Sequence, residues 1–137
     1  MSETEQITMV KEAIHNPDEL RHFMRVKNVD KTVSASINGQ EIARSNYVLK
    51  VQEAGHDLYD PVYYFPKKDV QMEALVRTEK STHCPLKGDT EYFDINFADT
   101  TLENSAWHYS QPYNRSKMLQ EHIGFDQSRI QIMEHIK

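Results

Sequence analysis

The sequence predicts a mainly β protein, a compact antiparallel sandwich or half-open barrel of about six or seven short strands. From Val33 onward, apolar side chains alternate with polar ones at a period of two, as on half-buried strands. Asn38-Gly39 follows the first alternating run and is the strongest short signal for a tight hairpin turn. The chain of 137 residues is long enough for one domain with a core of its own.

The N-terminal residues 1–32 follow a different pattern, which predicts a helical extension ahead of a β-rich domain at 33–137. The apolar residues at helical spacing are Val10, Ile14, Leu20, Phe23 and Met24. Asn16 is suited to cap a helix and Pro17 to occupy its first position. Because a proline also interrupts a helix that enters from before it, two short helices are expected.

The later elements follow in order from alternation and turn residues. The expected strands are 33–37, 47–51, 62–65, 70–74, 93–97, 102–109 and 130–132. Residues 98–101 form a polar turn between two of them. Met118, Leu119, His122 and Ile123 fit one short C-terminal helix that Gly124 would close.

Composition favours a soluble, cytoplasmic protein. The net charge of −5 argues against a nucleic-acid partner, since no basic stripe is present to neutralise phosphates. No apolar run approaches the roughly 20 residues that span a membrane. The first residues carry glutamates where a signal peptide carries positive charge, and the single Cys84 has no partner for a disulfide.

The segment from Thr82 to Gly88 combines reactive residue types. Cys84 precedes Pro85, so its backbone is biased toward extended geometry. In an extended segment His83 and Cys84 point to opposite faces, so they are poorly placed to bind one metal ion or to act together as base and nucleophile. Lys87 then places a cation beside a glycine.

Four motifs in one order resemble a known family. They are 42–45 (Ile-Ala-Arg-Ser), 62–66 (Val-Tyr-Tyr-Phe-Pro) with Asp69, 82–88 (Thr-His-Cys-Pro-Leu-Lys-Gly) with Tyr92, and 106–109 (Ala-Trp-His-Tyr) with Pro112. Together they resemble the family catalogued as domain of unknown function four-two-seven, from about Val33 to Glu134. The resemblance implies a compact, mostly β domain of unsettled function that sometimes carries a nucleotidyltransferase-like label.

The candidate catalytic residues are Cys84, His83 and Lys87. Cys84 would need positive charge nearby to become a nucleophile, and otherwise is a small buried apolar residue. The seven histidines lack metal-ligand spacing, so no metal site is predicted. Nucleotidyl transfer generally uses two or three carboxylates on one edge, whereas Asp94 is the only carboxylate beside Asn96 on its strand face.

The leading hypothesis is a domain that binds a small, anionic molecule in an aromatic-lined pocket near residues 82–88. The predicted ligand-binding residues are Arg44, Tyr64, Lys87, Tyr92, Trp107 and Tyr109. Charged residues inside β-forming segments, such as Glu53 and Asp69, are expected to form ion pairs or converge at a pocket mouth.

Two alternatives stay open. In the first, the chain is a protein-interaction or homo-oligomerisation module whose amphipathic helix, 17–26, docks on a partner or a second copy. In the second, it is a nucleotidyltransferase-like enzyme. The sequence indicates no particular cofactor or reaction.

Overall fold

The computed structural model describes residues 9–136, which form two antiparallel β-sheets and three short 3-10 helices. The larger sheet contains, in spatial order, β1 (Ile14–Asn16), β2 (Glu19–Asn28), β5 (Leu49–Ala54), β6 (Val62–Pro66), β10 (His122–Phe125), β9 (Thr100–Pro112), β8 (Gly88–Phe97) and β7 (Leu75–Cys84). The smaller sheet has the order β11 (Gln131–His135), β3 (Thr32–Ile37) and β4 (Gln40–Ser45). The 3-10 helices are η1 (Lys67–Asp69), η2 (Met72–Ala74) and η3 (Asn114–Leu119).

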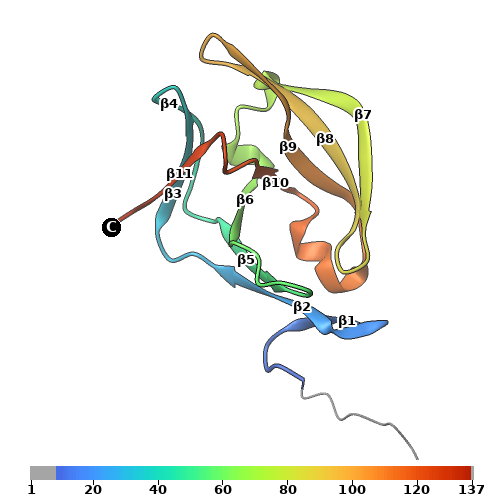
Figure 1. Ribbon diagram of the computed structural model, residues 1–137. Coiled ribbons are helices and arrows are strands. Elements are labelled where there is room, and N and C mark those ends of the chain that lie inside the picture. Colours follow the sequence, from blue (N-terminus) through green and yellow to red (C-terminus); the bar gives the residue numbers. More distant parts are fainter. Residues whose placement is uncertain (1–8, 137) are drawn as a thin grey trace, which may run out of the picture.

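The two sheets enclose a core between them. Figure 1 shows the long strands β7, β8 and β9 on one side, the small sheet on the other, and β6 and β10 between them. Neither sheet closes on itself. The prediction of a mainly β, antiparallel protein is therefore confirmed, but the strands number eleven in the described residues rather than six or seven, and β2, β7, β8 and β9 are ten residues or longer.

Two hairpin turns follow directly from local backbone chemistry. Asn38 and Gly39 both have positive φ, 52° and 77°, which is the conformation of a type I′ turn. Ala98 and Asp99 adopt the same region, with φ of 52° and 59°. The turns predicted at Asn38-Gly39 and within 98–101 are thus confirmed.

The predicted N-terminal helices are wrong for the described residues. Asn16 does not cap a helix; its side-chain oxygen accepts a hydrogen bond from the backbone of Asp18 at 3.0 Å and closes the turn between β1 and β2. β2 then pairs with β5 from Phe23 opposite Ala54 onward. Because this pairing satisfies the backbone in extended form, it overrides the helical spacing of the apolar residues. The alternative of an interaction module assumed a helix at 17–26, but most of this segment is strand β2.

Two further segments differ from expectation. The strand expected at 70–74 is replaced by η2, which Val70 and Ala74 anchor in the core. The expected short helix over 118–123 is helical only at its start, because η3 ends at Leu119. Residues His122–Phe125 form strand β10 instead. Gly124 lies inside this strand, opposite Tyr64 of β6 and Trp107 of β9, instead of closing a helix. The expected last strand at 130–132 overlaps β11.

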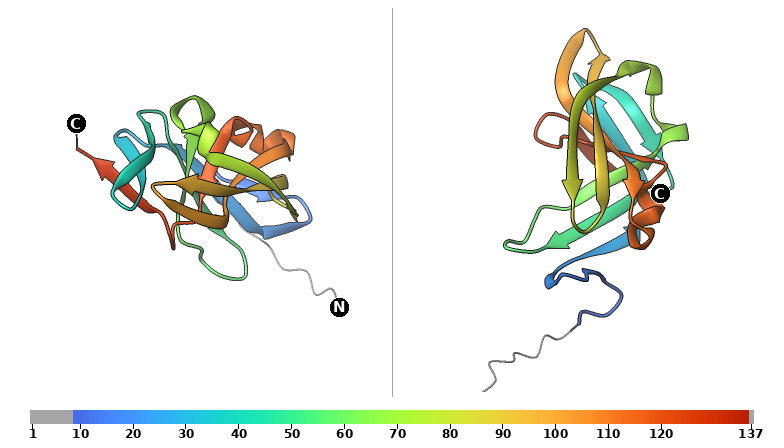
Figure 2. Two further views of the ribbon diagram at one scale, coloured as in Figure 1. Left: turned by 90° about the horizontal axis from the view of Figure 1, so that it is seen from above. Right: turned by 90° about the vertical axis from the view of Figure 1, so that its right-hand side faces the viewer.

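The apolar side chains form two clusters. The larger one lies between the small sheet and the middle of the large sheet and includes Val33, Ile42, Phe65, Ile95 and Phe125. The second lies next to β2, β5 and η3 and contains Met24, Val51, Tyr64, Leu86, Tyr109 and Leu119. Figure 2 shows the β1–β2 hairpin at the same end of the molecule as β5. None of the described helices has the length and apolar character needed to cross a membrane.

Candidate functional site

The turn between β7 and β8 is fixed by its own glycine and by η3. Gly88 has φ of +119°, and a Cβ at this position would collide with the backbone of β9. Ser116 donates from Oγ to the carbonyl oxygen of Lys87 at 2.7 Å. Arg115 donates from Nη2 to the carbonyl oxygen of Pro85 at 2.7 Å. The turn therefore holds Lys87 in one place.

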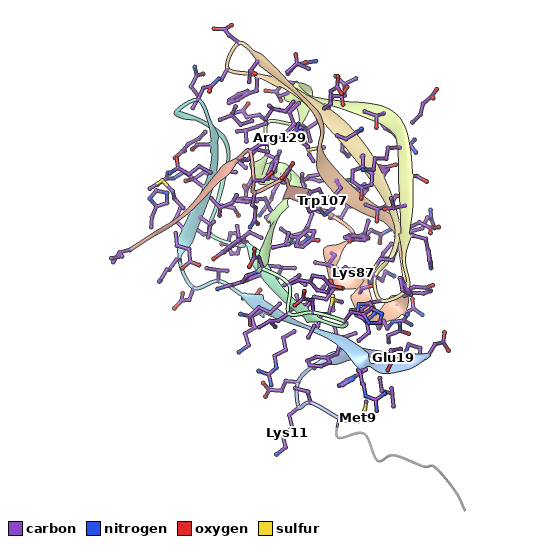
Figure 3. All side chains as sticks on the ribbon, in the orientation of Figure 1. Met9, Lys11, Glu19, Lys87, Trp107 and Arg129 are labelled. Carbon is purple, nitrogen blue, oxygen red and sulfur yellow. The ribbon has the colours of Figure 1, made fainter. Side chains whose placement is uncertain are left out.

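Lys87 points inward and forms an ion pair with Glu53 of β5. Only 7% of Lys87 is exposed. The other carboxylate oxygen of Glu53 lies 2.7 Å from Nε2 of His22, on β2. In Figure 3, Lys87 lies near η3, with Trp107 above it and the β1–β2 hairpin below. Three strand and turn segments thus bring three ionisable groups together.

The pKa shifts of this pair show that both groups are charged. Burial alone would raise the pKa of Glu53, but the ammonium of Lys87 and the hydrogen bonds from Lys87 and His22 hold it below its usual value. Burial alone would lower the pKa of Lys87, but Tyr109 and Glu53 beside it raise it above its usual value. The pair is therefore ionised across the neutral range.

Hydrogen bonds fix the ring of His22. Asn16 places its amide nitrogen 3.3 Å from Nδ1 of His22. The oxygen of that amide already accepts from Asp18, which fixes the orientation of the amide. An amide nitrogen donates, so Nδ1 accepts from Asn16 and Nε2 donates to Glu53. Asn16 and Glu53 together therefore orient the ring of His22.

Aromatic residues enclose the other side of the ion pair. Lys87 Nζ lies 5.8 Å from the ring centroid of Tyr109, whose ring is 6.2 Å from that of Tyr64. Tyr64 is 2% exposed, and its hydroxyl accepts a hydrogen bond from Trp107 Nε1 at 3.2 Å. Burial raises the pKa of Tyr64 to about 12 and raises that of Tyr109 further. Both phenols are neutral, so these rings act as walls and hydrogen-bond partners.

Two clefts border this network. The first, called the hairpin cleft here, has a volume of about 540 Å³ and is lined by the β1–β2 hairpin (Asn16, Glu19, Arg21, His22), the loop after β5 (His56, Tyr59) and Pro85. The second has a volume of about 510 Å³, and Glu53 and Tyr59 are among the residues that line it. His22 and Glu53 therefore connect the buried lysine to open space on two sides.

The structure brings together some of the predicted residues. Lys87, Tyr64, Trp107 and Tyr109 belong to the network, and Cys84 packs against the same apolar cluster as a partly buried free thiol. Tyr92 lies next to the network: it is opposite Trp107 in the pairing of β8 and β9, and the two ring centroids are 6.3 Å apart.

The other predicted residues lie elsewhere. Arg44 is in the small sheet, half exposed, and pairs with Glu41 at 2.6 Å. His83 points to the opposite face from Cys84, as predicted from the extended backbone, and is paired with Asp89 at 2.7 Å. Arg44 therefore does not contribute to a pocket near residues 82–88.

His22 is the functional candidate that sequence reasoning missed, because its segment was expected to be helical. For Glu53 the sequence predicts only that a charged residue in a β-forming segment needs a partner. The ion pair with Lys87 confirms this expectation. In residues 9–136, no three His, Cys, Asp or Glu side chains converge as a metal site.

The family follows from comparison with known proteins. A family model described as a domain of unknown function (DUF427) matches residues 25–135. The chain belongs to the DUF427 family. The match covers the network residues of β5 to β9, whereas His22 and the β1–β2 turn precede it. Comparison of the chain with curated proteins gives no significant match. The description of DUF427 assigns no activity, so nucleotidyl transfer stays a prediction.

Proposed function

We propose that this DUF427 protein binds a small molecule with an acidic group in the hairpin cleft. The observation that carries this proposal is the position of His22, which lines the cleft and also hydrogen-bonds the partly buried Glu53. A ligand in the cleft therefore lies against a residue that contacts the ion pair of Glu53 and Lys87.

The cost of burying charge supports a functional role for the network. Removing two charges from water is expensive, and apolar residues of similar size often stabilise a fold equally well. Ionisable groups with shifted pKa values beside a cleft are typical of functional sites. Lys87 and Glu53 have shifted pKa values, and Glu53 and its neighbour His22 line open clefts.

The lining of the cleft indicates the class of ligand. Arg21 and His56 offer cationic or hydrogen-bonding groups, and Tyr59 offers an aromatic surface. A volume of about 540 Å³ suits a metabolite-sized molecule. Glu19 at the same cleft disfavours ligands with several negative charges packed together.

The geometry also makes His22 a positioning residue. Its ring nitrogens are both engaged, Nδ1 by the amide of Asn16 and Nε2 by the carboxylate of Glu53. The imidazole ring is therefore held in one orientation on the wall of the cleft. The ion pair with Lys87 in turn fixes the carboxylate that orients the ring.

A ligand screen by thermal shift tests the proposal, because a ligand that binds only the folded state raises the melting temperature. The panel contains inorganic phosphate, phosphorylated sugars, short carboxylic acids and nucleoside triphosphates. The affinities of hits are measured by calorimetry in the unaltered protein and in His22→Gln. We expect at least one acidic ligand to bind, with an affinity that His22→Gln lowers.

His135→Gln is the matched control, because His135 lies in the small sheet and contacts Ser34. This variant should bind as the unaltered protein does. The proposal fails if no acidic compound binds, or if His22→Gln and His135→Gln bind with equal affinity.

A further inference from the structure

A second group of side chains lies on the opposite face of β7 from Cys84 and is independent of the proposed ligand site. His83 Nδ1 lies 2.7 Å from Asp89 Oδ1. His83 Nε2 lies 3.0 Å from the hydroxyl oxygen of Tyr113. A carboxylate only accepts hydrogen bonds, so Nδ1 carries a proton. In the neutral ring Nε2 then carries none and accepts a hydrogen bond from the hydroxyl of Tyr113.

This is the order of groups found in activated nucleophiles: a hydroxyl, a base that accepts its proton, and a carboxylate that orients the base. Sequence alone does not reveal it, because Tyr113 follows β9 while His83 and Asp89 face each other across β7 and β8.

Regular structure holds all three residues in place. His83 and Asp89 are directly opposite in the strand pairing. The backbone nitrogen of Tyr113 donates to the carbonyl oxygen of Lys87 at 3.1 Å. The rings of His83 and Tyr113 meet edge to face, at 5.8 Å and 80°.

A fixed cation lies on the reactive ring. The guanidinium carbon of Arg115 is 4.1 Å from the ring centroid of Tyr113. Arg115 is itself held by hydrogen bonds to two carbonyl oxygens, at 3.1 and 2.7 Å. Negative charge that develops on the ring when the hydroxyl loses its proton is stabilised by this cation. Tyr113 is 37% exposed, so a reagent can reach it.

This arrangement contributes little to the stability of the fold. The side chains of His83 and Asp89 are 54% and 61% exposed, and ion pairs this exposed contribute little to folding.

We propose that Tyr113 is a base-assisted nucleophile that accepts a group from an activated acyl or phosphoryl donor, such as an acyl phosphate. The hydroxyl oxygen of Tyr113 forms a bond to the carbonyl carbon or to the phosphorus. The bond from that centre to its leaving oxygen breaks, and the leaving group takes the electron pair. The proton of the phenol moves to Nε2 of His83, and Asp89 stabilises the imidazolium. The product is an O-acyl or O-phosphoryl tyrosine.

Two reagents test this inference on the full-length chain. Toluenesulfonyl fluoride transfers a sulfonyl group to a phenol with loss of fluoride, and acetyl phosphate offers both an acyl and a phosphoryl centre. Peptide mass spectrometry measures the rate of modification at each tyrosine. Tyr47 is the internal control: it is 66% exposed and has Lys68 over its ring at 4.8 Å, but no described histidine contacts it. We expect Tyr113 to react at least about tenfold faster than Tyr47 with both reagents, a modest share of typical general-base effects.

His83→Gln and Asp89→Asn separate base assistance from simple exposure. In His83→Gln, the rate at Tyr113 should fall to that at Tyr47. Asp89→Asn should give an intermediate rate, with the melting temperature of both variants unchanged. Equal rates at the two tyrosines, or an unchanged rate in His83→Gln, would overturn the proposal. Reaction with the sulfonyl fluoride alone would exclude acyl phosphates as the donor class.

Discussion

At the scale of single residues, Lys87 shows how a charge is kept inside this fold. Its ammonium meets the carboxylate of Glu53 on one side and the ring face of Tyr109 on the other. Aromatic rings attract cations at their faces, and the attraction grows when water is excluded. The ion pair with Glu53 is the stronger interaction, because it joins full charges in a partly desolvated site.

Removing one partner of this ion pair should lower the free energy of unfolding more than replacing both partners by apolar residues. We expect Lys87→Met to lower the free energy of unfolding by about 3 kcal/mol, because the carboxylate of Glu53 stays partly buried without its ammonium. Glu53→Leu should cost a similar amount, and the double variant clearly less than the sum. Urea unfolding of the four proteins measures the cycle.

An exposed pair in the same protein provides the control. Arg44 and Glu41 are half exposed, so Arg44→Met should cost no more than about 0.5 kcal/mol. Strictly additive effects of the Lys87 and Glu53 substitutions would contradict the buried-pair interpretation.

At the scale of elements, β10 determines where the aromatic side chains of Tyr64 and Trp107 can lie. It pairs with β6 on one side and β9 on the other, and Gly124 lies opposite both Tyr64 and Trp107. A Cβ at Gly124 would lie 2.6 Å from Trp107 Nε1. Glycine is required here because the indole and the phenol occupy the space where a side chain would stand.

Gly124→Ala should therefore displace Trp107 from its hydrogen bond with Tyr64. Overpacking of this kind typically costs about 1–3 kcal/mol. Trp107 is the only tryptophan in the sequence, so a change in fluorescence maximum reports the displacement directly. Gly55→Ala is the control, since its Cβ would approach His22 no closer than 3.4 Å. An unchanged spectrum in Gly124→Ala would show that the indole does not depend on this glycine.

At the scale of the whole molecule, a hydrogen bond between two side chains links a strand of the large sheet to a strand of the small sheet. Tyr63 of β6 donates from its hydroxyl to Glu134 of β11 at 2.5 Å. Lys31 adds an ion pair to the same carboxylate at 3.3 Å. Burial and Glu134 raise the pKa of Tyr63 to about 12, and the hydrogen bond from Tyr63 helps to lower the pKa of Glu134.

Tyr63→Phe should lower the free energy of unfolding by about 1 kcal/mol near neutral pH. The folded state holds this phenol proton more tightly than the unfolded state, so the stabilisation is complete below pH 10.0 and lost as the pH rises toward about 12. On the acid side it is lost as the pH falls below 4.5, where Glu134 takes up a proton.

Chemical denaturation across this pH range measures the difference between the two proteins. Hydrogen exchange should show faster opening of β11 in the variant. Tyr47→Phe, at an exposed position, should change neither measurement. A difference that stays constant up to pH 12 would contradict the role of the phenol proton.

The accuracy of the sequence-based predictions followed the range of the interactions involved. The hairpin at Asn38-Gly39 was predictable because its positive φ values depend on two adjacent residues. The opposite orientations of His83 and Cys84 were predictable because alternation is a property of any strand. The N-terminal segment was not, because pairing with β5 outweighs the helical spacing in 7–30.

The candidate site was predictable only in part for the same reason. Lys87 and the aromatic residues stood out by residue type, but their partners did not. His22 reaches Glu53 from 31 positions away, and Tyr113 reaches His83 from 30 positions away. No local pattern specifies contacts of this kind.

The sequence by itself determined the β class, the tight turns, the extended segment before Pro85 and the family. These depend on backbone preferences and on motifs within a few residues. The tertiary structure alone decided that Lys87 points inward to Glu53, that Arg44 lies outside the site, and that Gly124 makes room for an indole. The physical reason is that burial, charge pairing and steric fit arise only when distant strands meet.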